Sequence, residues 1–275
     1  MVTITRMEPM DKGLIFEYVC SSEYQLLMTV KSLRIYKPLI EQVLDKFQTK
    51  MIIDGLHNDY DYFISLSLVD DKGRLMEPSC TRLFTPYSNK KKFKTVNYIH
   101  KNDFYYYPSG RSTCSPSILK LDENNYICSH DIYWGDSAQN LTLLFKSSDK
   151  GETWEYLSRI SPCFWGSLFK LHNDVYMFGI STEYGNALLY KSYDNGATWP
   201  ESVELYKKDK NDEKGYHKAP MPTVILNNRL WLNVEYGTWK HKFSIHALSC
   251  SIDCDIIKKE NWTITEPLYI PKDAK

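Results

Sequence analysis

A turn motif that occurs twice constrains this sequence more than any other feature. Residues 147–154 are Ser-Ser-Asp-Lys-Gly-Glu-Thr-Trp, and residues 192–199, about 45 positions later, are Ser-Tyr-Asp-Asn-Gly-Ala-Thr-Trp. The Asp side chain can accept hydrogen bonds from the backbone of its own turn, the Gly takes positive φ at little cost, and the Trp can seal an apolar gap. The motif therefore predicts the same stiff turn in two consecutive structural repeats.

Short apolar segments of strand type surround the motif in a repeated order. Each complete unit has three such segments before the turn and one after it, and a third unit follows in which Ser251-Ile-Asp253 leads to Trp262 without the Gly. The sequence therefore predicts an all-β region of three four-stranded antiparallel meanders. The expected strands are residues 116–121, 126–130, 141–146 and 156–157, then 166–171, 175–179, 187–191 and 203–205, then 221–226, 230–234 and 243–248.

The two turns and the strand layout resemble the sialidase superfamily, in which this motif is called the Asp-box and each meander is a blade of a β-propeller. The resemblance covers residues 111–265 and implies three blades. A propeller ring closes with roughly four to eight blades. We therefore expect the ring to be incomplete in this chain: either the chain is a fragment, or another chain completes the ring, or the N-terminal strands contribute to it. If the chain is a full-length product, we expect a partner chain or an oligomer, because exposed edge strands invite pairing.

The first third of the sequence has a different character. Residues 14–19 and 60–69 have the pattern of strands, whereas the apolar spacing in residues 37–47 is compatible with one short helix. The Tyr-rich strand, its polar turn and the following Phe-Thr-Pro resemble the end of a fibronectin type III-like β-sandwich. We expect three parts, which are an N-terminal β-rich segment (1–88), a linker (89–110) and the propeller blades (111–275).

Composition excludes several classes of function. Lys and Arg number 34 and Asp and Glu number 34, so no basic excess points to nucleic acid or to an anionic membrane surface. The seven cysteines form no Cys-x-x-Cys pair and no second pair accompanies Cys250 and Cys254, so we expect reduced thiols, no metal site and no cofactor. The first residues lack a cationic segment followed by an apolar run, which predicts a cytoplasmic protein.

Meander geometry predicts where a functional site lies. The start of the first strand and the end of the second strand of each blade lie at the rim opposite the Asp-boxes, and charged and aromatic residues gather there, whereas the box side carries Asn-rich turns. Each of these residues also has a structural interpretation: the histidines as satisfied core groups, the repeated Glu-Tyr-Gly as a loop-packing device, and Trp165, Trp134 and Trp239 as core wedges. The predicted site comprises Arg111, His130, Asp131, Trp165, Glu183, Tyr184, His217, Lys218, Glu235 and Tyr236.

The family resemblance implies roles for these residues. Segments such as Ser115-Pro-Ser-Ile and Cys163-Phe-Trp-Gly look like bacterial proteins labelled exo-α-sialidase. On that basis Arg111 would clamp an anion, Asp131 or His130 would transfer a proton, and Glu183 with Tyr184 would be the second catalytic pair. The remaining five residues would bind substrate, namely Trp165, His217, Lys218, Glu235 and Tyr236.

Three functions are compatible with this rim. The resemblance favours a sialidase-like glycoside hydrolase acting on an acidic glycan. However, only Arg159 and Arg229 follow Arg111, both near strand ends on the other side, so the arginine triad of true sialidases cannot be assembled from this chain. There are two alternatives. One is a propeller polysaccharide lyase, which uses His and Tyr as base and acid to cleave a uronate glycan by β-elimination. The other is a non-catalytic glycan-binding propeller.

Overall fold

We describe a computed structural model, which covers residues 2–35, 37–45, 47–88, 93–103, 112–133 and 138–269. Its described part is nearly all β, with several antiparallel sheets and one 3-10 turn, Lys259–Asn261. Contacts divide the chain into two compact units. The first unit comprises Met1–Thr113 with Gly151–Tyr156, and the second comprises Cys114–Lys150 with Leu157–Lys275.

The first unit contains two antiparallel sheets that enclose one apolar core. The three-stranded sheet has the order β1-β2-β5 and the four-stranded sheet the order β4-β3-β6-β7. Ile4 and Phe16 from one sheet join Val30 and Ile64 from the other in that core, which is the packing of a β-sandwich. The strands are β1 (Val2–Met10), β2 (Gly13–Cys20), β3 (Gln25–Ser32), β4 (Ile40–Leu44), β5 (Lys50–Ile53), β6 (Tyr62–Val69) and β7 (Leu75–Phe84).

The helix predicted over residues 37–47 is wrong. Ile40–Leu44 forms β4, which pairs with β3 through Leu27 opposite Val43. Val43 is exposed whereas Leu44 is buried, which is the alternation of a strand at the edge of a sheet. The spacing of the apolar residues fits both periodicities over so short a segment, and pairing with β3 decides between them.

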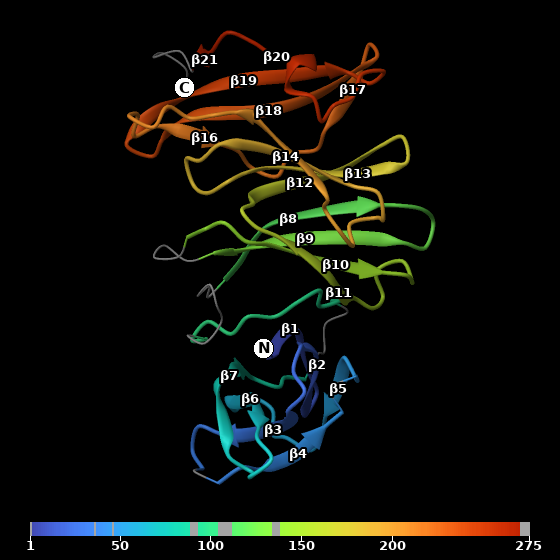
Figure 1. The fold of residues 1–275 in the computed structure, drawn as a ribbon, viewed down its shortest axis with the longest axis vertical. Helices are drawn as coiled ribbons and strands as arrows, with labels where there is room; N and C mark the ends of the chain where they lie inside the picture. Colours follow the sequence, from blue (N-terminus) through green and yellow to red (C-terminus); the bar gives the residue numbers. More distant parts are fainter. Residues whose placement is uncertain are drawn as a thin grey trace. The chain divides into compact units, whose positions relative to one another are not determined.

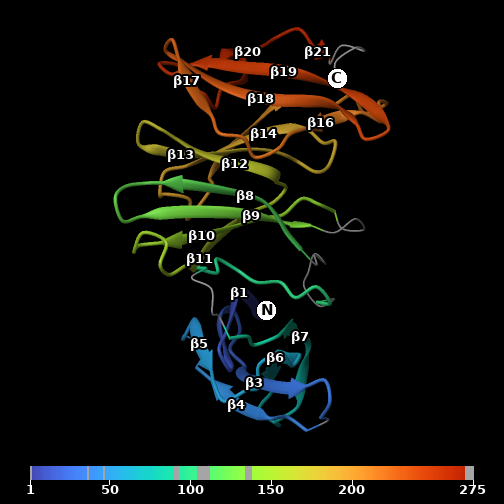
Figure 2. The same cartoon turned by 180° about the vertical axis from the view of Figure 1, so that it is seen from behind.

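The second unit contains three sheets. The first two are four-stranded meanders with the orders β11-β10-β9-β8 and β12-β13-β14-β15, and the three sheets follow one another along the chain (Figure 1, Figure 2). Their strands are β8 (Ser112–Lys120), β9 (Tyr126–Tyr133), β10 (Thr142–Ser147), β11 (Glu155–Ile160), β12 (Phe164–Leu171), β13 (Asp174–Ile180), β14 (Ala187–Ser192) and β15 (Glu201–Tyr206).

The third sheet has six strands where four were expected. Strands β16 and β17 both pair with β18, and β20 and β21 both pair with β19. Pro220 and Pro222 separate β16 from β17, and Pro267 precedes β21, because proline cannot donate a hydrogen bond to a neighbouring strand. The strands are β16 (Gly215–His217), β17 (Val224–Leu226), β18 (Arg229–Thr238), β19 (His241–Ser251), β20 (Trp262–Ile264) and β21 (Leu268–Tyr269).

The two complete box turns have the contacts that their sequence predicts. In the second, Asp194 Oδ1 accepts the backbone N–H of Thr198 at 2.8 Å, Ser192 Oγ donates to Asp194 Oδ1 at 2.8 Å, and Gly196 has a φ of 89°. In the first turn Gly151 has a φ of 87°. Because neighbouring strands are antiparallel, the β13–β14 connection lies at the opposite end of its sheet from the second box turn.

Apolar side chains are exposed on strands of the first and third sheets of this unit. Ile118 on β8 and Val224, Ile225 and Leu226 on β17 are each more than half exposed. A groove of about 430 Å³ is lined by Ile118 and Pro116 on β8, by Phe169 on β12 and by Met221, which lies between β16 and β17.

We expect this surface to mediate association of the chain with itself. Replacing Ile118 and Ile225 together by Lys should shift the purified protein toward the monomer without lowering its melting temperature, since both side chains are exposed. Light scattering across a concentration series measures the mass, and thermal unfolding checks the fold. A wild-type chain that is monomeric at every concentration would contradict this expectation.

Candidate functional site

A close backbone approach joins the second and third sheets at the rim. Tyr216 on β16 donates its N–H to the Gly185 carbonyl at 3.1 Å, beside the turn that connects β13 and β14. A Cβ atom placed on Gly215 would lie only 1.8 Å from the Tyr184 carbonyl oxygen, so a side chain at this position is excluded. The glycine therefore allows β16 to bring His217 beside Tyr184.

His217 is the centre of the site. It is 9% exposed, and its Nδ1 lies 2.7 Å from Glu235 Oε2 on the paired strand β18. Because a carboxylate accepts hydrogen bonds, Nδ1 carries the proton in this contact and the lone pair of a neutral ring lies at Nε2. Among the described residues, Nε2 is buried without a hydrogen-bond partner.

Four aromatic rings surround His217, and we call them the aromatic cage. The ring centroid of Trp165 lies 4.0 Å from that of His217, Phe243 lies at 4.9 Å, Trp239 at 5.3 Å and Tyr184 at 6.2 Å. The rings come from β12, from the β13–β14 turn, from the β18–β19 turn and from β19. Residues distant in sequence thus converge on one imidazole.

Glu183 and Tyr184 form the side of the site next to Trp239. Glu183 Oε1 accepts the indole N–H of Trp239 at 3.0 Å, and its Oε2 accepts an amide N–H of Gln139 at 3.1 Å. The Tyr184 hydroxyl accepts the backbone N–H of Trp239 at 3.1 Å. Burial raises the pKa of Tyr184, and the neighbouring Glu183 carboxylate raises it further, so the phenol stays protonated at neutral pH.

Trp165 has a backbone conformation that is rare for a large side chain. Its φ is 52°, at a register shift between β12 and β13. Its N–H donates to Asp131 Oδ2 at 2.6 Å, and its carbonyl accepts from Lys218 Nζ at 2.7 Å. Two charged side chains therefore hold the peptide groups on either side of Trp165 and fix the direction of its indole.

Asp131 and Lys218 lie behind Trp165, away from the surface. Asp131 is fully buried and accepts a second hydrogen bond from Thr142 Oγ1 at 2.5 Å, and Lys218 Nζ also donates to Ser167 Oγ at 2.8 Å. Burial raises the pKa of Asp131 to about 7 and lowers the pKa of Lys218 to about 7. In this arrangement both residues position Trp165, and neither presents an atom to a ligand.

Two other predicted site residues, His130 and Tyr236, lie apart from the aromatic cage. His130 is buried, stacks on Phe145 with centroids 5.2 Å apart, and has its pKa lowered by burial to about 4. Tyr236 donates its hydroxyl to Asp212 Oδ2 at 3.0 Å, and burial and this contact raise its pKa to about 12. Arg111 lies outside the described residues.

Three residues of this site are not among those predicted from the sequence, namely Gln139, Phe243 and Trp239, of which only Trp239 had a structural interpretation as a core wedge. Gly237 gave a signal, because a Cβ there would press on the Phe243 ring at 2.7 Å. A glycine that precedes an aromatic turn residue therefore marks close packing of backbone against a ring.

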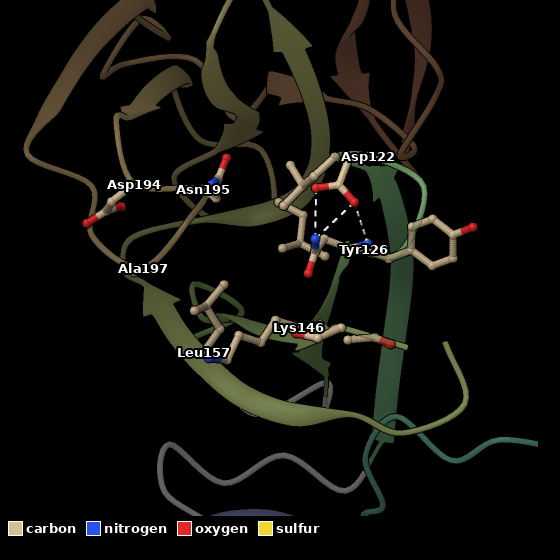
Figure 3. A pocket seen from close by; sticks show the side chains of 12 residues that line it. Asp122, Tyr126, Lys146, Leu157, Asp194, Asn195 and Ala197 are labelled. Atoms are coloured by element: carbon tan, nitrogen blue, oxygen red, sulfur yellow. Dashed lines mark hydrogen bonds between the residues drawn. The ribbon is translucent and has the colours of Figure 1, made fainter. Parts of the chain in front are cut away.

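A pocket lies among the box turns of the first two sheets of the second unit. Its volume is about 370 Å³, and it is lined by residues that include Asp122, Lys146 and Asp194 (Figure 3). The Asp122 carboxylate accepts hydrogen bonds from Asn124 and Asn125 in its own turn, and Asp194 accepts them from its box turn. These carboxylates stabilise turns, which is their expected structural role.

Among the described residues, no group of three or more His, Cys, Asp or Glu side chains is placed to hold a metal ion. None of the helical segments in this part of the chain has the length and apolar character needed to cross a bilayer.

Comparisons with known proteins show a distant likeness of fold. No protein-family profile matches the chain, and no curated protein matches its sequence. An α-L-arabinanase of Penicillium chrysogenum has a TM-score of 0.41 at 16% identity, with 58% of this chain and 50% of that chain covered. A Hadza microbial sialidase has a TM-score of 0.44 at 10% identity, with 96% and 71% covered. An ulvan lyase of polysaccharide lyase family 25 has a TM-score of 0.41 at 14% identity, with 91% and 55% covered. The chain thus spans about half the length of the arabinanase and of the ulvan lyase.

The structure predicts that Asp131 acts through folding and not through contact with a ligand. Asp131→Asn turns an amide N–H toward a buried donor, and each unsatisfied donor costs about 1–3 kcal/mol. We expect urea unfolding to show a loss of this size. Glu183→Gln, at a half-exposed carboxylate, is the control and should change stability by less than about 1 kcal/mol. An Asp131→Asn protein of unchanged stability would contradict the positioning role.

Proposed function

We propose that the chain processes an acidic glycan at the aromatic cage. The observation that supports this most is the placement of His217 between an orienting carboxylate, Glu235, and a protonated phenol, Tyr184. Aromatic faces cover the apolar C–H faces of sugar rings, so the rings around His217 suit a glycan. A neutral imidazole and a protonated phenol suit general base and general acid.

The contacts favour β-elimination over hydrolysis. In such a reaction on a uronate, His217 Nε2 removes the proton from C5, next to the carboxylate. The electrons of that C–H bond form the C4=C5 double bond while the C4–O bond breaks, and the Tyr184 hydroxyl protonates the departing oxygen. The raised pKa of Tyr184 suits a proton donor and works against a phenolate nucleophile.

Sialidase-like hydrolysis is the second candidate, and one contact favours it. Glu183 lies beside Tyr184 and could remove its proton, which would make the phenol a nucleophile. Asp131, the acid/base residue that the family resemblance implies, is fully buried in this structure. Hydrolysis would therefore need a different general acid. For either reaction, Arg111 remains the proposed clamp for the substrate carboxylate.

Removal of either proton-transfer group should abolish most of the turnover. We expect His217→Gln and Tyr184→Phe each to lower the rate by about 10²–10⁴-fold. The assay is a panel of sialylated and uronate-containing oligosaccharides, in which absorbance of a new unsaturated uronate reports elimination and free sialic acid reports hydrolysis. Tyr236→Phe is the matched control, because Tyr236 contacts Asp212 and lies apart from the cage. Binding without turnover of any glycan would support a lectin and contradict both reactions.

Glu235 should act as a positioning residue through His217. Glu235→Gln keeps the size of the side chain but replaces the carboxylate that holds Nδ1–H. We expect a lower kcat and a smaller change in KM, because the imidazole loses the charged acceptor that holds its Nδ1–H. A turnover rate equal to that of the wild-type chain would contradict the positioning role.

A further inference from the structure

Trp239 occupies the outer side of the site and contacts three of its polar residues, Glu183, Tyr184 and His217. Its indole N–H donates to Glu183, its backbone N–H donates to the Tyr184 hydroxyl, and its ring packs edge-on against His217. These are the three groups to which the proposed chemistry assigns proton transfer. One residue therefore covers the base, the acid and the neighbouring carboxylate together.

Trp239 is also the least buried member of the aromatic cage. It is 72% exposed, although a tryptophan in a core normally loses most of its exposed surface. It lies in the short turn between β18 and β19, and two hydrogen bonds and its ring contacts hold it over His217. An exposed side chain in a turn can move without disturbing the sheets.

The buried imidazole nitrogen gives an independent reason for movement. His217 Nε2 is buried and has no hydrogen-bond partner among the described residues. A buried polar atom without a partner is costly, and native structures keep few of them. A ligand that displaces Trp239 would reach this nitrogen.

We propose that Trp239 is a displaceable lid whose two N–H groups hold the places of donor groups on the glycan. The closed lid satisfies Glu183 and Tyr184 when the site is empty. On binding, the turn that carries Trp239 moves outward with its indole, sugar hydroxyls replace both donors, and His217 Nε2 becomes accessible. The inference rests on the proposed function, because the lid covers the same site. Its test nevertheless uses no glycan.

The test is the rate at which diethyl pyrocarbonate modifies His217. The reagent adds a carbethoxy group to a neutral imidazole nitrogen that it can reach, and peptide mass mapping assigns each modified histidine. We expect slow modification of His217 in the wild-type chain and a rate at least about tenfold higher in Trp239→Ala. Trp239→Phe keeps an aromatic cover but loses the indole N–H, and its rate should lie between the two.

Two controls separate a lid from a structural wedge. Trp231→Phe removes an indole on the same strand pair that donates to the Leu226 carbonyl, and it should leave the His217 rate unchanged. His130, buried in the same unit, should stay slow in every variant. An unchanged His217 rate in Trp239→Ala, or an equal rise at His130, would overturn the proposal. The experiment uses no glycan, so the modification rate of His217 tests the lid even if the chain turns over no glycan.

Discussion

The hydrogen bonds to the backbone on either side of Trp165 are the interaction on which the rest of the site depends. Asp131 comes from the first sheet of its unit, Trp165 from the second, and Lys218 from the segment that follows β16 in the third. One buried network of hydrogen bonds therefore connects residues of all three sheets. Burying charged groups costs free energy, and this cost is offset only when each group has well-placed partners. The network therefore favours a single arrangement of the sheets. That arrangement sets the position of the Trp165 ring against His217.

This network makes the back of the site rigid while its front stays adjustable. Behind His217, the close approach at Gly215 and the buried Asp131 leave no room for rearrangement. In front, a turn with an exposed indole closes the site by two hydrogen bonds. A catalytic group needs a fixed orientation and also needs access, and these requirements conflict in a rigid wall. Under the proposed function these two requirements fall to different elements, since the sheets orient the imidazole and the turn that carries Trp239 packs against it.

Local patterns in the sequence predicted the strands and turns, whereas they carried no information on which rim residues are buried. The box turns and the strands around them follow from alternation and turn chemistry within a few residues, so β9, β13 and β18 lie where they were expected. The segment 37–47 was misassigned because its apolar spacing fits a helix and a strand equally. At the rim, the sequence shows polar residues near strand ends, but it could not show that Asp131 lies behind Trp165 while His217 lies beside Tyr184. Burial depends on which strands become neighbours, and one sequence does not contain that information in local form.

The repeated Glu-Tyr-Gly shows why equivalent positions in repeats need not share a role. Tyr184 lies in a turn with a φ of 58°, where the approach of Gly215 directs its ring toward His217. Tyr236 lies within β18 as the partner of Tyr216, and its hydroxyl donates to Asp212. Both segments have the same three residues and both contact His217, but the first does so through the Tyr184 ring and the second through the Glu235 carboxylate. The role of each copy therefore depends on its local backbone and on its neighbouring strands, so equivalent positions in repeats can contribute different groups to one site.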